Sequence, residues 1–348
     1  MASGFQVYSP SGGVRLDGGD RQVKHYQYFS GYLANGNSTT LSVGGGYNIG
    51  NGDWGLDVTP VDYRLKAVST SNTITVTANG ESFWYRINVF KLNEAASTGY
   101  GFRSISNSGF NQIDEKTVGY QVLATGSLAG SGNYSMSRLT IPSTYPNDII
   151  VVAKPKNPAT NTSYRLFSNF EDFYIGTTRY RYVDMNAAAG SSVLATEPVD
   201  YAIIQRCGLF DDSLISNQTP ANYGFNVYQS NGDLSFTTEK PTFRVRAARH
   251  HEITTSSLGA ATWHTTSNQT DLLNTYAMAH GYGEIKRRVF GPSADRQFAA
   301  SARLAKWDYP NNTFGTDIIS YSGQVSSGTS TFNRVWEGHR TEMVGYVV

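Results

Sequence analysis

A three-part internal repeat constrains the fold of this chain more than any other feature. Each copy opens on a Gly-Phe pair, has a second Gly eight positions after the first, and places an apolar residue four positions further on. The three copies, which align without gaps, are Gly4–Asp17, Gly101–Asp114 and Gly224–Thr237. A pattern that recurs within one chain indicates a structural unit that is used more than once.

The pattern inside each copy predicts a β-hairpin. In the first copy, Phe5 and Val7 alternate with polar residues, as expected for a strand with one buried face. The central Gly12 supplies the positive φ that a tight connection requires. The return strand then brings an apolar residue back to the same face. In the three copies this residue is Leu16, Ile113 and Phe236.

The spacing of the copies predicts the organisation of the chain. The copies begin 97 and 123 residues apart, and either distance is the size of a β-sandwich domain. We therefore expect three tandem β-sandwich-like modules, at residues 1–97, 98–220 and 221–348, with the first as the candidate for docking onto a larger assembly. The alternating strands Phe83–Phe90 and Val199–Ile204 are predicted to close the first and second modules.

Composition supports an all-β fold. Charged residues make up 16% of the chain and aromatic residues 13%, and the 35 Gly outnumber the 11 Pro, a balance that favours short strands joined by tight turns. One segment, 268–281, has a polar start, an apolar Leu272-Leu273 pair and a closing Gly, and predicts a short helix in the last module. Further predicted strands are Tyr63–Val68, Thr73–Thr77, Ile149–Ala153, Tyr180–Val183 and Phe243–Ala247.

Charge and hydropathy exclude several classes of partner. The net charge of +1 gives no field that would gather nucleic acid or an acidic membrane surface. No apolar stretch approaches the length of a membrane span, and the N-terminus has no secretory leader, so we expect a soluble product of the cytoplasm. The single cysteine, Cys207, cannot form an intrachain disulfide and is expected to be buried.

Basic residues concentrate at one place, in 284–290 with Arg296, Arg303 and Lys306 after it. This group is compatible with phosphate or acidic polysaccharide. A strand whose charged residues face solvent explains it more simply.

A search for metal and nucleophile motifs predicts no cofactor and no catalytic residues. Two candidate ligands, His250 and His251, are adjacent, and adjacent residues of a strand point to opposite faces. Neither a zinc-protease motif nor paired Cys-x-x-Cys is present. Cys207 has no histidine nearby, and Gly44-Gly45-Gly46 lacks the Lys-Ser/Thr ending of a phosphate loop and indicates a turn or bulge. The other candidate metal ligands are Glu252, His264 and His280.

Two kinds of site stay open on sequence grounds. Glycan hydrolysis needs two carboxylates about 5 to 10 Å apart, which distant strands can supply. The candidates are Glu171, Asp172, Asp184, Asp211 and Asp212, although such residues also serve ordinary turns. Exposed aromatic side chains offer a binding surface for sugar rings or a partner protein. Trp54, Trp263 and Trp336 are candidates for such a surface or for the core.

The first repeat also carries a family resemblance. Its Gly4-Phe5-x-Val7-Tyr8 opening, the turn at Gly12, the Leu16-Asp17 pair and the following Asp20-Arg21 are similar to the N-terminal signature of tail, tail-fibre or baseplate-associated structural proteins of tailed bacteriophages. The match covers about the first 21 residues, and the rest of the chain resembles that family in composition only. Neither heptads nor Gly-x-y runs are present, so the chain departs from the long-fibre members.

The resemblance implies a non-enzymatic structural component of a virion, made in the host cytoplasm, that contributes to assembly and host attachment. The implied partners are other virion proteins and copies of the chain itself, with a host surface glycan or outer-membrane receptor as a further partner. The residues that would bind a receptor are not identified by the sequence. The alternatives are a tailspike-like glycan hydrolase and a free carbohydrate-binding module.

Overall fold

Strands dominate the structure, a computed structural model. It describes residues 6–8, 14–17, 23–59, 65–79, 81–92, 101–106, 109–114, 120–130, 137–175, 177–190, 196–206, 226–228, 234–237, 241–253, 261–266, 268–279, 283–289, 296–325, 333–334 and 338–347. Helical structure in these ranges is limited to short turns, namely η1 (Ile49–Asn51), α1 (Gln269–Leu273) and η3 (Tyr309–Asn311). The prediction of an all-β fold with one short helix is confirmed.

All three repeat copies form antiparallel β-hairpins, as predicted. Their strands are β1 (Gln6–Tyr8) with β2 (Val14–Asp17), β9 (Gly101–Ser106) with β10 (Gly109–Asp114), and β18 (Asn226–Tyr228) with β19 (Leu234–Thr237). In the first and third hairpins the register is the same, since Val7 pairs with Leu16 as Val227 pairs with Phe236. Both also have a bulge at the next residue, whereas the second hairpin is regular.

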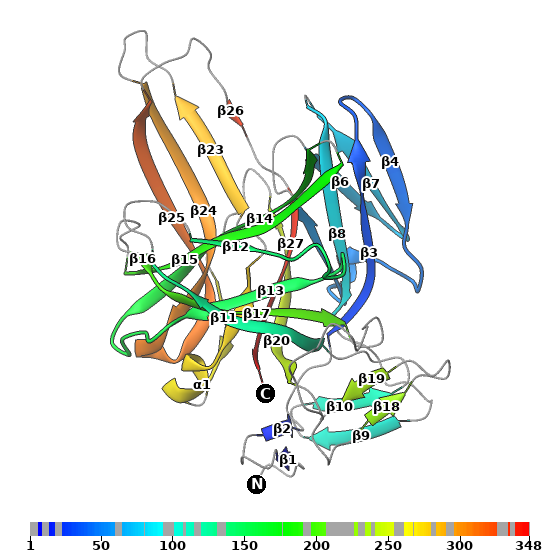
Figure 1. Cartoon of the computed structure of the whole chain (residues 1–348), viewed down its shortest axis with the longest axis vertical. Coiled ribbons are helices and arrows are strands. Elements are labelled where there is room, and N and C mark those ends of the chain that lie inside the picture. The colour runs from blue at the N-terminus through cyan, green and yellow to red at the C-terminus, as the bar shows by residue number, and fades with distance from the viewer. Residues whose placement is uncertain are drawn as a thin grey trace.

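The three hairpins lie at the same end of the molecule, beside the N-terminus, although they come from distant parts of the chain (Figure 1). The second and third are in contact, because β10 lies against β18 and β19. Hairpins from three distant parts of the chain are therefore neighbours at this end.

Residues 23–92 form a two-sheet unit, which we call the sandwich. One sheet has the order β3-β8-β5 and the other β4-β7-β6. Alternate residues of both sheets, among them Ile87, Val58 and Ile74, fill the core between them. Every residue of β5 is buried, since its second face lies against β20 and β27. The bounds are β3 (Lys24–Leu33), β4 (Ser38–Ser42), β5 (Trp54–Thr59), β6 (Leu65–Thr70), β7 (Thr73–Ala78) and β8 (Phe83–Lys91).

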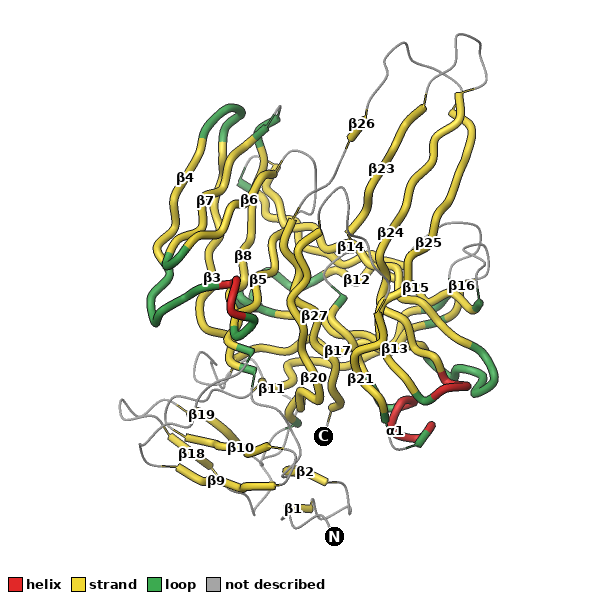
Figure 2. The backbone as a smooth tube through the Cα atoms, turned by 180° about the vertical axis from the view of Figure 1, so that it is seen from behind, coloured by secondary structure: helices red, strands yellow, loops and turns green. Residues whose placement is uncertain are grey.

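Six strands close into an antiparallel barrel in the order β11-β17-β13-β22-β27-β20. Figure 2 shows β20 and β27 in the middle of the molecule, between the sandwich strands on one side and β24 and β25 on the other. The bounds are β11 (Tyr120–Leu128), β13 (Ile150–Pro155), β17 (Val199–Arg206), β20 (Thr242–Ile253), β22 (Tyr276–Met278) and β27 (Gly338–Val347). Three of these strands come from segment 98–220 and three from 221–348, so a boundary at residue 220 does not separate two hydrogen-bonded units.

A second large sheet, which we call the long sheet, covers the barrel. Its main path is β12-β15-β14-β24-β23-β26, with β16 on β15 and β25 joining β24 to β21. The bounds are β12 (Ser137–Thr140), β14 (Ser163–Ile175), β15 (Thr178–Ala189), β16 (Thr196–Glu197), β21 (Ala261–Thr265), β23 (Gly283–Val289), β24 (Arg296–Asp308), β25 (Thr313–Val325) and β26 (Asn333–Arg334).

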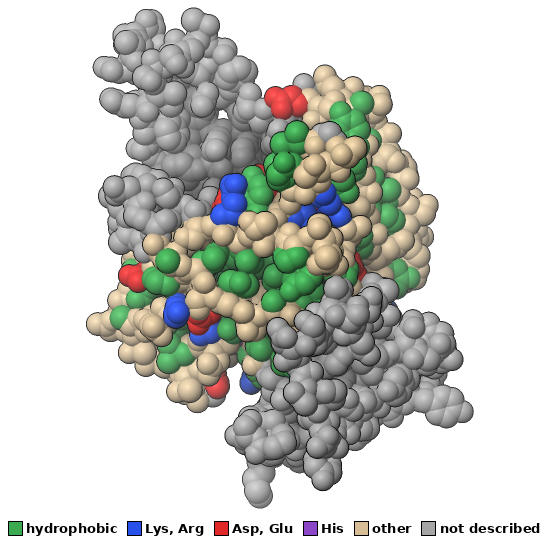
Figure 3. All heavy atoms as spheres, viewed as in Figure 1, with side chains coloured by type: hydrophobic (Ala, Val, Ile, Leu, Met, Phe, Trp, Pro, Cys, Tyr) green, Lys and Arg blue, Asp and Glu red, His purple; other side chains and the backbone are tan. Residues whose placement is uncertain are grey.

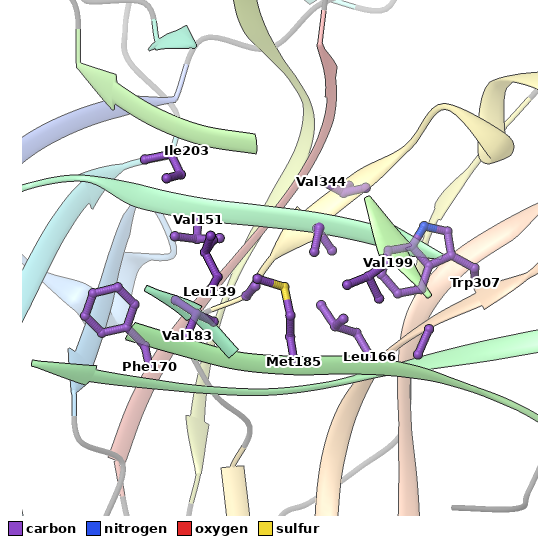
Figure 4. Close-up of a cluster of buried hydrophobic side chains, with 14 of the residues drawn as sticks. Leu139, Val151, Leu166, Phe170, Val183, Met185, Val199, Ile203, Trp307 and Val344 are labelled. Carbon is purple, nitrogen blue, oxygen red and sulfur yellow. The ribbon is translucent and has the colours of Figure 1, made fainter. Parts of the chain in front are cut away.

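The largest core lies between the barrel and the long sheet. In Figure 4, Val151 and Ile203 of the barrel project toward Val183 and Met185 of the long sheet. The other face of the barrel strands contributes Ile150, Val152 and Ile204 to a second core, which Phe90 and Leu92 of the sandwich also enter. Because both faces of β13 are buried, its sequence is a continuous apolar run instead of an alternating one.

The predicted helix at 268–281 is shorter than expected. Asn268 caps its start, since Oδ1 accepts a hydrogen bond from the backbone N–H of Asp271 at 2.9 Å, but α1 ends at Leu273. Residues Tyr276–Met278 instead form β22, which completes the barrel by pairing with β13 and β27. The burial of Ala277 and Met278 in the two cores outweighs the local helical pattern.

Candidate functional site

Exposed aromatic side chains gather where the long sheet meets the sandwich. Of the five most exposed large hydrophobic side chains in the described residues, four lie here: Tyr32 (55%), Tyr174 (38%), Ile175 (63%) and Tyr180 (42%). Monomeric proteins rarely leave such groups of apolar residues uncovered unless they are used for binding. We call this surface the aromatic band. Its members are Tyr32, Trp84, Phe173, Tyr174, Ile175, Tyr180 and Tyr182.

Ring contacts form two groups within the band, one on each face of β14. The ring of Trp84 on β8 lies 5.4 Å from Tyr32 on β3 and 4.5 Å from Tyr174 on β14, measured between centroids. On the other face of β14, Phe173 stacks on Tyr180 at 5.6 Å and meets Tyr182 edge-on at 6.1 Å. The band therefore spans the junction of the sandwich and the long sheet.

The register of the strand pairs determines which of these side chains lie beside each other. Phe173 and Tyr180 are directly opposite each other in the β14–β15 pair, as Tyr32 and Trp84 are in the β3–β8 pair, and opposite residues share a face. Figure 1 shows the end of β14 reaching β8, and the two strands are in contact. Because Phe173, Tyr174 and Ile175 alternate between faces, the end of this hairpin is apolar on both sides.

Polar groups flank the rings on the outer face of β14 and β15. The Arg138 guanidinium donates two hydrogen bonds of 2.7 Å to Asp184 and lies 3.6 Å from the ring centroid of Tyr182. Asn169 donates from Nδ2 to Oε1 of Glu171 at 2.8 Å. The hydrogen bond to Asp184 raises the pKa of Arg138. Burial and the charge of Glu171 raise the pKa of Tyr182, so its hydroxyl stays protonated at neutral pH.

A buried arginine fixes the junction beneath the band. The side chain of Arg86 on β8 is 3% exposed and lies 3.8 Å from Asp172 of β14. It donates to the backbone carbonyls of Asn147 and Ile149, both at 3.0 Å, and its guanidinium lies 4.1 Å from the ring centroid of Phe170. Because these partners belong to the long sheet and to the segment that leads into β13, the contacts join the sandwich to the rest of the molecule.

Two further arginines support the same region. Arg179 donates to both oxygens of Asp172, at 2.7 and 2.5 Å. Arg181 donates to the backbone carbonyls of Pro142, Tyr145 and Pro146 at 2.6 to 2.7 Å. Burial, followed by the charge of Arg179, lowers the pKa of Arg181 to about 10, which leaves it charged at neutral pH. The outer loop 142–146 is thereby held against β15.

The candidate carboxylates are engaged within this network. Asp172 accepts from Arg179, Asp184 from Arg138, and Glu171 from Asn169. Glu171 and Asp172 are adjacent on β14 and lie on opposite faces. Asp184 lies on the outer face with Glu171, and its two oxygens accept the hydrogen bonds from Arg138. Asp211 and Asp212 are outside the described residues.

The histidine candidates separate into two arrangements. His250 stacks on His339 with centroids 5.4 Å apart, and His250 Nε2 lies 3.4 Å from His339 Nδ1. His251 instead lies with Nε2 2.9 Å from Glu342 Oε2. In the described ranges, no three His, Cys, Asp or Glu side chains converge as ligands for one metal ion. His264 is on β21 and Glu252 on β20, and His280 falls outside the described residues.

Of the tryptophans singled out from the sequence, the two that the structure describes do not belong to the band. Trp54 is in the sandwich core, edge-on to Tyr26 and Tyr47. Trp263 packs edge-on against Phe314 beside the large core. Trp336 lies outside the described residues. The tryptophan of the band is Trp84, which the sequence identified only as part of a strand. The sequence did contain one signal for this surface. The run Phe173-Tyr174-Ile175 places apolar side chains on both faces of its strand.

The other candidates from the sequence lie in ordinary strands and turns or outside the described residues. Residues 284–289 belong to strand β23, and Arg296 and Arg303 to β24. Lys306 lies 3.2 Å from Asp308. The glycine run forms a turn, in which Gly45 and Gly46 have φ of 69° and 72°. Cys207 lies outside the described residues.

No helix in the described part of the chain is long and apolar enough to span a membrane. Comparisons with protein families, with curated proteins and with solved structures found no match to this chain.

Proposed function

We propose that this chain is a non-enzymatic structural component of a tailed-phage virion, located at the tail, tail tip or fibre, that contributes to assembly and host attachment. The observation that carries the proposal is the relation between the first and third hairpins. The first contains the sequence signature that resembles phage tail proteins, and the third repeats its register and its bulge 220 residues later. A shape that is kept at two distant places in one chain supports a shared docking task.

The distribution of surfaces supports the same role. Each hairpin is a two-stranded sheet separate from the barrel and the long sheet, and the edge strands of such sheets can pair with neighbouring proteins or with further copies of the chain. The aromatic band lies elsewhere, at the junction of the sandwich and the long sheet. Assembly and attachment would then use different surfaces, with the hairpins facing the particle and the band available to a host receptor.

Mass spectrometry of purified particles from the encoding phage tests the proposal. The chain should be present at a constant ratio to the major tail proteins after density-gradient purification. A chain that lacks residues 1–22 should keep the unfolding temperature of the body and be lost from particles, because its first hairpin is gone. Absence of the full-length chain from particles would refute the virion role.

A further inference from the structure

We infer that the outer face of the β14–β15 hairpin, with the rings of Phe173, Tyr180 and Tyr182, is a binding site for a neutral saccharide. The inference rests on the proposed attachment role and names the chemical class of the partner. It is carried by the combination of exposed rings with ordered hydrogen-bonding side chains on one face of a sheet.

The rings provide the apolar half of the site. A pyranose ring has a C–H face that packs on aromatic side chains, and tyrosine adds a hydroxyl group at the edge of the contact. Tyr180 and Ile175 are the most accessible members on this face, and Phe173 supports Tyr180 by stacking. Among the apolar members on this face only Ile175 is aliphatic, so flat rings that can stack on a sugar predominate.

The flanking side chains provide the polar half. Saccharide hydroxyls both donate and accept hydrogen bonds, and this face offers carboxylate acceptors in Glu171 and Asp184 and a guanidinium donor in Arg138. Arg138 and Asp184 are held in place by their hydrogen bonds to each other, and Glu171 by its hydrogen bond from Asn169, before any ligand binds. Side chains that are already ordered lose less conformational entropy on binding.

The charge balance selects a neutral ligand over an acidic one. Two carboxylates, Glu171 and Asp184, face one guanidinium, Arg138, on this surface, which therefore has no cationic excess to attract a polyanion. In the described part of the face shown in Figure 3, Lys and Arg side chains occur as separate spots and form no continuous basic area. An acidic polysaccharide or a nucleic acid would find no matching field here.

An array of immobilised bacterial glycans, with neutral O-polysaccharides beside sialylated and uronate-containing ones, tests this inference on the full chain. We expect binding to at least one neutral glycan. Tyr180→Ala should weaken it about two- to tenfold, the usual effect of one aromatic contact. Glu171→Gln should also weaken it, because it replaces a charged acceptor. Val68→Ala is the matched control, since Val68 is similarly exposed at 44% on the sandwich, and it should bind like the unaltered chain.

Three outcomes would overturn the saccharide site: binding to acidic glycans only, neutral binding that Tyr180→Ala leaves unchanged, or no glycan binding at all. Unchanged thermal unfolding of the Tyr180→Ala chain excludes misfolding as the cause of a loss. Each negative outcome is separable from the virion role, because the presence of the chain in purified particles is measured independently. A chain that is in the particles and binds no glycan would point to a protein receptor for the band.

Discussion

The backbone N–H of Leu56 donates a hydrogen bond to Nδ1 of His250 over 3.3 Å, although the two residues are 194 positions apart in the chain. Leu56 is on β5 of the sandwich and His250 on β20 of the barrel, so this bond crosses between the two units. Because Nδ1 is the acceptor, the neutral ring carries its proton on Nε2, which then donates to His339 Nδ1 at 3.4 Å. A second proton on His250 would remove the acceptor that Leu56 needs.

Acid should therefore weaken the fold through His250. Burial, with the neighbouring His339 and His251, lowers the pKa of His250 to about 3, below the value of about 6.5 for an unfolded chain. The neutral ring thus stabilises the folded state fully above pH 6.5, and this contribution is lost as the pH falls toward 3. We expect a loss on the order of 3 kcal/mol between pH 7 and pH 4, measured by urea unfolding at a series of pH values.

His250→Gln is the informative variant for this prediction, because the amide oxygen can accept from Leu56 and does not titrate. Its free energy of unfolding should vary less with pH in this window than that of the unaltered chain. An identical pH dependence in both chains would show that other groups are responsible.

Removing the Arg86 side chain should separate the sandwich from the rest of the molecule. Arg86→Ala leaves the carbonyls of Asn147 and Ile149 without this donor and removes a charge beside Asp172, which keeps Arg179. Each buried acceptor left unsatisfied costs about 1–3 kcal/mol. Thermal unfolding measures the loss. Arg138→Ala is the control: that side chain also pairs with an aspartate but is 53% exposed, so its removal should cost less than about 1 kcal/mol. Equal losses of stability in the two variants would show that burial of the arginine does not determine the cost of removing it.

A single methyl group at Gly345 should disturb closure of the barrel. This residue of β27 pairs with both β20 and β22, and a Cβ atom there would overlap the backbone carbonyl of Arg244 and lie 2.8 Å from the ring of Phe243. Gly345→Ala should destabilise the chain by at least about 2 kcal/mol in urea unfolding. Gly44→Ala, where the nearest atom is the movable hydroxyl of Tyr26 at 3.2 Å, should change stability by less than about 0.5 kcal/mol.

Local structure was predictable because its determinants are close together in the sequence. The hairpin at Gly4–Asp17 depends on alternation and a central Gly within 14 residues, and strands β8 and β17 begin at the predicted Phe83 and Val199. Strand β22 was not predictable in the same way. Its three residues follow a helical pattern, and only the pairing of Ala277 with Ala153 and Val344, from opposite parts of the chain, makes them a strand.

The candidate site was beyond prediction for a related reason. Tyr32, Trp84 and Tyr180 are spread over 149 positions, and no local pattern indicates that the β3–β8 pair meets the end of β14. The Arg86–Asp172 contact that holds this junction is equally non-local. Sequence did identify Glu171 and Asp184, but only among five carboxylates that could supply a pair for hydrolysis. Their hydrogen bonds to Asn169 and Arg138 instead make them fixed polar groups beside the rings.

Electron cryomicroscopy of intact particles tests the central claim most directly. The account predicts density for this chain on the tail or its tip, with the three hairpins against neighbouring virion proteins and the aromatic band, centred on Tyr174 and Tyr180, facing outward. Particles without this chain would contradict the structural role, and particles in which the band is buried against the tail would contradict its part in attachment.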